Sequence, residues 1–244
     1  MQKEKGIVII PAYNEEKTII RLIAKIKIIQ PDLDIVVIDD CSTDQTYNVL
    51  ISSNIPVISL PCNLGYGGAL QTGFKYAYGK NYQFALTMDA DGQHDPESIE
   101  TLLREMDSSP DVDLIIGSRF LANANNYKAS IPRQAGINLL RWIIKILAKE
   151  KISDPTSGFQ LIKRNVIKLY ATKNFYPKDY PDADLIILLH LRGFKIKEVP
   201  VIMHENMTGK SMHSGVKSFF YFLKLFLSLY ILLSSDLKHI KELK

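Results

Sequence analysis

Two acidic side chains directly follow one short apolar segment of the sequence. Residues 84–88 predict a buried strand, and Asp89 and Asp91 come immediately after it. Gly92 permits the turn that would bring both carboxylates to one cation, and Asp95 can cap the helix that follows. Oxygen ligands at a strand end suit Mg²⁺ or Mn²⁺, and these cations bind diphosphates. The segment therefore indicates either a metal–diphosphate site or an ordinary acidic turn that caps a helix.

The rest of the chain must position these residues. Largely apolar runs predict five strands, at residues 6–10, 35–38, 55–60, 84–88 and 112–116. Helical segments separate them, so we expect an α/β protein with a mostly parallel sheet buried on both faces. Ligands of such sheets bind at the carboxyl ends of the strands. That rule brings to one edge the residues that follow the strands: Tyr13, Glu15, Asp39, Asp40, Asp89, Asp91 and Arg119.

Length and composition limit the class of protein. A chain of 244 residues with 46% hydrophobic content is sufficient for one large α/β domain. A net charge of +4 is too small to indicate nucleic-acid binding. Cys41 and Cys62 are the only cysteines, which excludes a disulfide framework and a cysteine-based zinc site. The charged N-terminus runs directly into a strand, so we expect no secretory signal and a cytosolic location.

A glycine-rich turn follows the third predicted strand. Gly65, Gly67 and Gly68 precede a helical segment, and such a turn allows the backbone to approach a nucleotide closely. The dinucleotide fingerprint is not matched, because Leu70 stands three positions after Gly67 and because the turn follows the third strand. A P-loop is excluded, since the chain contains no G-x-x-x-x-G-K-[ST] motif.

Several runs, in this order, resemble the family 2 nucleotide-sugar glycosyltransferases. They are residues 11–15, 37–44, 63–69 and 89–93. Further runs resemble, more narrowly, the dolichyl- and undecaprenyl-phosphate sugar synthases, and these are residues 117–119, 133, 154–159, 193–200 and 209–211. The resemblance covers about residues 6–233. It implies a GT-A fold, which is a Rossmann-like mixed sheet with helices on both faces, together with inverting transfer from a UDP- or GDP-sugar and a divalent metal.

The resemblance also implies roles for individual residues. The nucleoside and the donor would be held by Pro11, Tyr13, Glu15, Asp39, Asp40, Gly65 and Gly68. Asp89 would face the ribose or the donor phosphate and the metal, while Asp91 and Gln93 would bind the metal. Arg119 and Arg133 would hold the phosphate of a lipid acceptor. A guanidinium group suits this role because it matches a phosphate in two-point geometry and stays charged.

The acceptor decides whether the reaction needs a base. A phosphate oxygen is already anionic at neutral pH, whereas a sugar hydroxyl needs a carboxylate to accept its proton. Asp182 and Asp184 stand where many family members carry such acids, so they are candidate catalytic residues. The acceptor is then polyprenyl phosphate or, alternatively, a hydroxyl of a growing surface polysaccharide. A noncatalytic nucleotide-sugar-binding subunit is the third possibility. Asp154 fits either a turn or a site residue.

One amphipathic segment, residues 131–151, indicates contact with a membrane surface. It combines a broad apolar face and Trp142 with Arg141, Lys145 and Lys149 at helical spacing. The pattern is typical of a helix lying in the membrane interface, and it also fits a helix that packs on the core. The segment is therefore a candidate interfacial helix within a glycosyltransferase domain spanning residues 1–210.

A second amphipathic segment lies near the C-terminus. Residues 216–235 are strongly apolar, but Lys217 and Lys224 leave only 11 uncharged residues, at 225–235. A spanning helix needs about 20. We therefore expect residues 211–244 to associate with the membrane at its cytoplasmic face, through a helix that lies in the interface or packs on another membrane helix. The similarity in length to short bacterial members implies a small separate membrane protein, or a second copy of the chain, as a partner.

Overall fold

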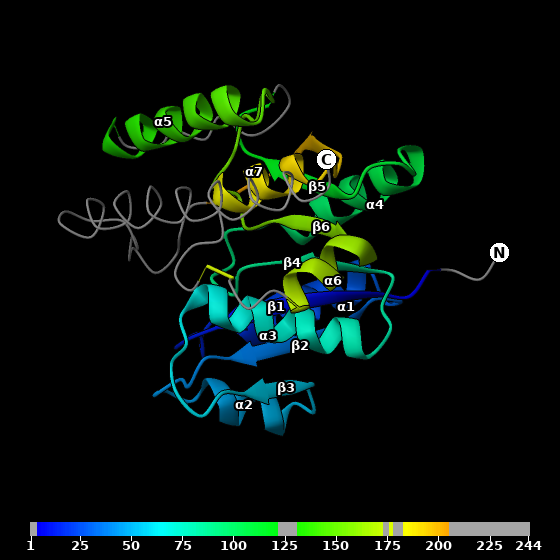
Figure 1. Cartoon of the computed structure of the whole chain (residues 1–244). Helices are drawn as coiled ribbons and strands as arrows, with labels where there is room; N and C mark the ends of the chain where they lie inside the picture. The colour runs from blue at the N-terminus through cyan, green and yellow to red at the C-terminus, as the bar shows by residue number, and fades with distance from the viewer. Residues whose placement is uncertain (1–3, 122–130, 173–175, 178–182, 205–244) are drawn as a thin grey trace.

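A seven-stranded sheet forms the centre of the protein in the computed structural model, which describes residues 4–121, 131–172, 176–177 and 183–204 (Figure 1). Its strands are β1 (Gly6–Ala12), β2 (Asp34–Asp39), β3 (Val57–Ser59), β4 (Phe84–Thr87), β5 (Leu114–Ser118), β6 (Gln160–Lys163) and β7 (Ile196–Pro200). Their order across the sheet is β3-β2-β1-β4-β6-β5-β7. Strand β6 runs antiparallel to its neighbours β4 and β5, and the other pairs are parallel.

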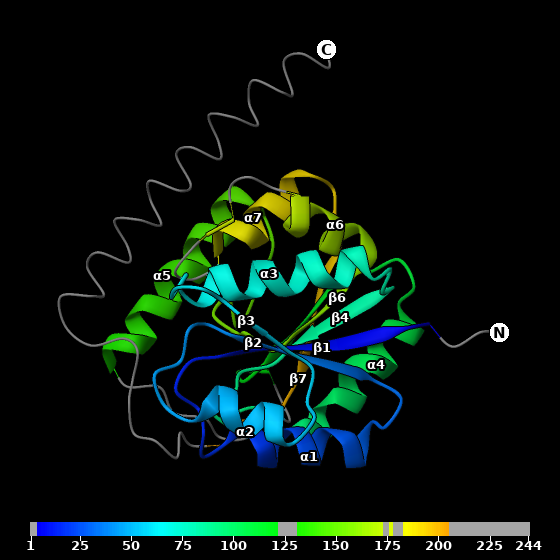
Figure 2. The ribbon, with the colours of Figure 1, turned by 90° about the horizontal axis from the view of Figure 1, so that it is seen from below.

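Helices cover both faces of the sheet (Figure 2). One face carries α1 (Ile19–Ile29), α2 (Thr46–Ser52) and α4 (Ile99–Ser108), the last preceded by a 3₁₀ turn at Pro96–Ser98. The other carries α3 (Tyr66–Gly79), α5 (Ile131–Leu147), α6 (Arg164–Thr172) and α7 (Ala183–Leu191). Strand β1 shows why its sequence is continuously apolar. Ile7 and Ile9 belong to one core, Val8 and Ile10 to the other, and all four are buried.

The five strands that the sequence predicts are all present, and the expectation of a mostly parallel sheet is confirmed. Strands β6 and β7 are additional to that prediction. Strand β6 has only four residues, with partly exposed Gln160 and Lys163 at its ends. Strand β7 lies at the edge of the sheet and includes Lys197 and Glu198, so neither sequence has the continuous apolar run that marks the other strands.

Strand β6 begins where β4 and β5 end. Gln160, its first residue, pairs with Thr87 and with Ile116. Because β6 runs antiparallel to β4 and β5, the loop at residues 153–159 that leads into β6 reaches the same edge of the sheet as the carboxyl ends of those two strands. The edge predicted from the parallel strands therefore also receives a loop that arrives from an antiparallel strand.

Helix α5 divides its apolar residues between two sides. Ile137, Leu140, Ile143 and Ile144 are buried in the core shared with α7. A second set is exposed: Leu139 by 36%, Trp142 by 60% and Ile146 by 53%. Only part of the broad apolar face that the sequence predicts is therefore exposed, because the rest packs on the core. No helix in the described ranges is long and apolar enough to cross a membrane. The predicted segment at 211–244 lies outside the described residues.

Candidate active site

Asp89 lies just beyond β4, and its carboxylate is held from two sides. Tyr66 donates its hydroxyl to Oδ1 at 2.8 Å, and Nε2 of His94 lies 3.6 Å from Oδ2. His94 is buried, its Nδ1 accepts the N–H of Asp89 at 3.0 Å, and its ring stacks on Phe159. Because Nδ1 is an acceptor, the neutral ring carries its proton on Nε2, the nitrogen that faces the carboxylate. These contacts fix the orientation of Asp89.

Gly158 lies against the same carboxylate. A Cβ atom at this position would lie 2.5 Å from the Tyr66 hydroxyl and 3.2 Å from Oδ1 of Asp89. The carbonyl oxygen of Gly158 accepts a hydrogen bond from the Thr87 hydroxyl at 2.7 Å, which fastens the loop to β4. Glycine is therefore required for the loop at 153–159 to approach Asp89 this closely.

Further acids surround Asp89. Burial raises the pKa of Asp91, and the negative charge of Asp89 raises it further. Burial also raises the pKa of Glu15, to which the charges of Asp91, Asp44 and Asp89 add. Since such effects weaken with distance, the loops that follow β1 and β4 bring these carboxylates close together. The structure thus gathers Glu15, Asp89 and Asp91 at one edge of the sheet.

The acidic residues after β4 fit a divalent cation whose coordination a bound substrate would complete. Within the described part of the chain, no three His, Cys, Asp or Glu side chains converge to hold a metal ion by themselves. Mg²⁺ is usually bound by one or two carboxylates together with the phosphates of a substrate. Asp89 and Asp91 could supply those carboxylates, with Gln93 as a neutral oxygen ligand. A cation would also relieve the repulsion that raises the pKa of Asp91.

The two acids at the carboxyl end of β2 are buried and make defined contacts. Asp39 accepts the N–H of Ser42 at 3.3 Å and the hydroxyl of Ser59 at 3.0 Å. Asp40 accepts the N–H groups of Leu64 and Gly65 at 2.6 and 2.9 Å, one on each oxygen. Asp40 therefore fixes the start of the glycine-rich turn, a function that the sequence analysis does not anticipate.

The glycines of that turn serve its own geometry. Gly65 has φ of 84°, a conformation that favours glycine, and it immediately precedes α3. A Cβ atom on Gly68 would lie 2.6 Å from Cβ of Leu64. Pro11 is buried within β1, whereas Tyr13, on the loop that follows, is 47% exposed and accessible to a stacking partner. The tyrosine is thus the residue of this set best exposed for contact with a nucleobase.

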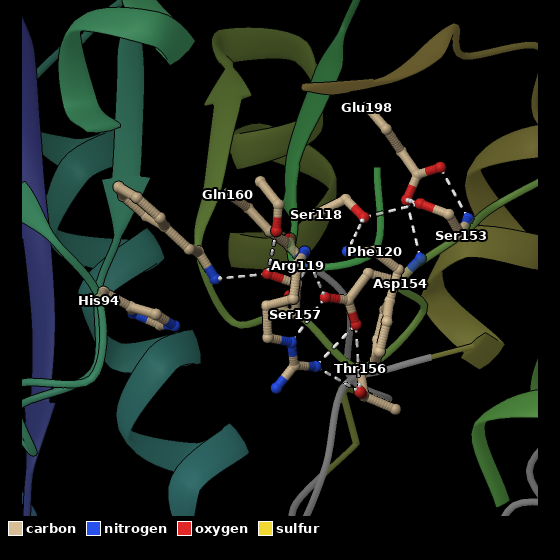
Figure 3. A network of polar contacts seen from close by, with 12 residues as sticks. His94, Ser118, Arg119, Phe120, Ser153, Asp154, Thr156, Ser157, Gln160 and Glu198 are labelled. Carbon is tan, nitrogen blue, oxygen red and sulfur yellow. Dashed lines mark hydrogen bonds and ion pairs between the residues drawn. The ribbon is translucent and has the colours of Figure 1, made fainter. Parts of the chain in front are cut away.

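Arg119 lies just beyond β5 and forms a buried ion pair with Asp154 (Figure 3). Its Nε and Nη2 donate to the two carboxylate oxygens at 2.6 and 2.7 Å, and its backbone N–H donates to Oδ2 at 3.0 Å. Nη2 also donates to the hydroxyl of Thr156 at 2.8 Å. The side chains of Arg119 and Asp154 are 3% and 0% exposed. Asp154 is therefore more than a turn residue, because it orients the arginine.

The other candidate residues lie in different places. Asp184 is buried in the first turn of α7, near Tyr170, whose pKa is raised by burial and, to a smaller extent, by the charge of Asp184. Arg133 belongs to the first turn of α5. Asp182 lies outside the described residues. The loop at 153–159 joins Asp89 to Arg119, since Gly158 adjoins the first and Asp154 binds the second.

Two supporting residues, Tyr66 and His94, are not identified by the sequence analysis. Tyr66 lies between Gly65 and Gly67 in the sequence and is the first residue of α3, and His94 directly follows Gln93. Nearness to these two motifs is the one signal that could have drawn attention to them. Their contacts with Asp89 depend on the packing of α3 and Phe159, which the motifs do not specify.

The sheet and its covering helices match a known fold. The fold is similar to that of glucosyl-3-phosphoglycerate synthase from Mycobacterium tuberculosis, crystallised with Mn²⁺, UDP-glucose and phosphoglyceric acid. The TM-score is 0.69 at 18% sequence identity, over 95% of this chain and 80% of that one. A mixed α/β fold of the GT-A type is thereby confirmed. The family model for glycosyl transferase family 2 matches residues 7–170, so the chain belongs to this family and is a glycosyltransferase.

Three curated relatives are similar to the chain over most of its length. It is 28% identical to the polyprenol monophosphomannose synthase of Mycolicibacterium smegmatis, over 87% of this chain and 82% of that protein. It is 26% identical to the undecaprenyl-phosphate mannosyltransferase of Micrococcus luteus, over 86% and 87%. A third relative is the UDP-N-acetylglucosamine–dolichyl-phosphate N-acetylglucosaminyltransferase of Methanococcus voltae, 27% identical over 89% and 94%. All three relatives are named for a polyprenol- or dolichol-linked phosphate; two are named for mannose and the third for N-acetylglucosamine.

Proposed function

We propose that this glycosyltransferase moves a hexose from a UDP- or GDP-sugar to polyprenyl phosphate, with Mg²⁺ or Mn²⁺, at the cytoplasmic face of a membrane. The observation that carries the proposal is the loop at 153–159, which contacts Asp89 through Gly158 and Arg119 through Asp154. It joins an acidic group suited to a metal–diphosphate to a guanidinium suited to a second phosphate. The names of the relatives support the same acceptor class, and one of them names a UDP-sugar as donor.

On the donor side, Asp89 and Asp91 would hold the cation together with Gln93. When bound, the cation would neutralise charge on the departing nucleoside diphosphate. Tyr66 and His94 keep the Asp89 carboxylate in one orientation, so little side-chain entropy remains to be lost on binding. Tyr13 would stack on the base, and Glu15 would lie beside the donor.

On the acceptor side, Arg119 and Arg133 would hold the lipid phosphate. A phosphate oxygen is anionic at neutral pH and attacks the sugar without a general base. The mechanism therefore does not need Asp184, which lies in the buried core beside Tyr170.

The direct test is transfer to lipid. Purified protein is incubated with undecaprenyl phosphate, Mn²⁺ and each of a set of labelled UDP- and GDP-sugars, and the organic phase is analysed for lipid-linked sugar. We expect one donor to give a metal-dependent product. Absence of lipid-linked sugar with every donor would contradict the proposal. Transfer instead to a saccharide hydroxyl would favour the alternative acceptor.

The membrane contact has its own prediction. The exposed apolar residues of α5 are flanked by exposed Lys145 and Lys149, which suit anionic headgroups. We expect Ile146→Ser to weaken binding to vesicles of phosphatidylglycerol roughly tenfold, because it removes apolar area from the contact. Ile51 on α2 is equally exposed, at 53%, but lies on the other face of the sheet. Ile51→Ser is therefore the matched control, and co-sedimentation gives the two affinities. Equal loss in both variants would contradict this orientation.

A further inference from the structure

The peptide group that joins Ser153 to Asp154 is held at both of its ends by charged side chains. Nε of Arg141, on α5, donates to the carbonyl oxygen of Ser153 at 2.7 Å. Oε1 of Glu198, on β7, accepts the N–H of Asp154 at 2.8 Å. The cationic guanidinium meets the negative end of the peptide dipole and the carboxylate meets its positive end. Each contact is a charge-assisted hydrogen bond, because one of its partners is ionised. The plane of this peptide is therefore fixed.

Glu198 directs its carboxylate entirely at this turn in the contacts that Figure 3 draws. Oε2 accepts the N–H of Ser153 at 2.7 Å, and Oε1 also accepts the Ser153 hydroxyl at 2.9 Å. Burial raises the pKa of Glu198, and the hydrogen bonds from Ser153 and Asp154 act in the opposite direction. A partly buried carboxylate with three donors from one turn is suited to holding that turn.

Arg141 connects the same turn to α5. The sequence places it in a basic stripe with Lys145 and Lys149, but the structure turns it inward. Its guanidinium lies over the ring of Phe120, 4.7 Å from the ring centroid. Phe120 directly follows Arg119 in the chain. A planar guanidinium can stack and donate at once, which a lysine cannot do. Arg141 and Glu198 thus both hold the peptide that leads into Asp154, and the carboxylate of Asp154 binds Arg119.

We propose that Glu198 and Arg141 are positioning residues for sugar transfer. Through the Ser153–Asp154 peptide they fix Asp154, and through Asp154 they fix the guanidinium of Arg119 toward the acceptor phosphate. The effect of these residues on sugar transfer rests on the proposed function, in which Arg119 holds the acceptor phosphate. Neither residue needs to touch either substrate.

The test compares transfer to lipid with transfer to water. Glu198→Gln keeps the size of the side chain but replaces one accepting oxygen by a donating NH₂, which must face an N–H of the turn. We expect the KM for undecaprenyl phosphate to rise roughly tenfold, the usual scale for losing a charged hydrogen bond. Metal-dependent hydrolysis of the donor should change less than about twofold, since Asp89 and Asp91 are untouched. Glu105→Gln is the matched control, because Glu105 pairs with Lys197 and Ser109 away from this turn.

A second variant and a second measurement make the test independent of activity. Arg141→Lys keeps the charge but loses the planar contact, so the acceptor KM should rise by a smaller factor, about threefold. In protein with ¹⁵N-labelled arginine, the buried Nε–H of Arg119 is assigned by its loss in Arg119→Lys. We expect its exchange with water to become at least about tenfold faster in Glu198→Gln, because a weaker hydrogen bond opens more often.

The outcomes separate the two hypotheses. If wild-type protein transfers no sugar to lipid, the proposed function fails, while the exchange of the Arg119 Nε–H still tests the positioning. If that exchange and the acceptor KM are both unchanged in Glu198→Gln, the positioning role is overturned. A loss of donor hydrolysis equal to the loss of transfer also overturns it, since the residue would then support the whole fold.

Discussion

Replacing Asp91 by asparagine is expected to lower the rate of sugar transfer on the order of a thousandfold. The substitution keeps the shape of the side chain but removes the charge that would hold a divalent cation beside Asp89. A cation at a departing diphosphate contributes several kcal/mol to the transition state, and each 1.36 kcal/mol corresponds to about tenfold in rate. The fold should be unaffected, because burial and the charge of Asp89 already disfavour the ionised form of Asp91.

The measurement is the initial rate with labelled donor at increasing Mn²⁺. Wild-type activity should disappear with EDTA and return with the metal, whereas Asp91→Asn should stay inactive at every concentration. Asp107→Asn makes the same change at an exposed position on α4 and serves as the control. A metal-dependent rate in Asp91→Asn close to that of the control would show that the cation binds elsewhere.

Asp154→Ala is expected to lower the free energy of unfolding by about 3–5 kcal/mol. The reason is that Arg119 would keep its positive charge in a site where its side chain is 3% exposed, without the carboxylate that balances it. Breaking a buried pair from one side is costly because the remaining charge stays desolvated. Urea denaturation followed by circular dichroism measures the change, provided that the m-value is unchanged.

The chain offers a matched comparison for this effect. Arg104 and Glu100 also form an ion pair, but they lie on the surface of α4, with side chains 78% and 55% exposed. Glu100→Ala should therefore cost less than about 1 kcal/mol. The double variant Arg119→Met with Asp154→Leu should recover much of the lost stability while transfer to lipid stays absent. Equal destabilisation by Glu100→Ala and Asp154→Ala would contradict the importance assigned to burial.

The sequence predicts the framework of the fold well, because the buried parallel strands carry an unambiguous pattern. The runs at β1, β2, β4 and β5 are apolar on both faces, and acids follow three of them. The short antiparallel strand β6 lacks that pattern and depends on β4 and β5 for its hydrogen bonds. Local periodicity therefore predicts the parallel strands but not the strand inserted between them.

The contacts within the site are harder to predict for a related reason. Asp154 is 35 residues from Arg119 in the sequence, and Glu198 is 44 residues from Asp154. Residue type alone left Asp154 open between a turn and a site residue. Arg141 illustrates the same limit, since helical spacing places it with two lysines although its guanidinium turns toward Phe120. Side-chain direction depends on the neighbouring elements, and only the folded chain specifies them.

The single loop at 153–159 has a consequence for how the reaction distance is set. Asp154 orients the group that would receive the attacking phosphate, and Gly158 adjoins the carboxylate that would hold the leaving group. One residue of extended chain spans about 3.3–3.6 Å, whereas reacting atoms poised for attack lie about 3–3.5 Å apart, so a change of one residue is as large as the reaction distance itself. The length of this loop therefore bears on the separation of the two groups, and we expect an insertion or deletion in it to alter the geometry of attack.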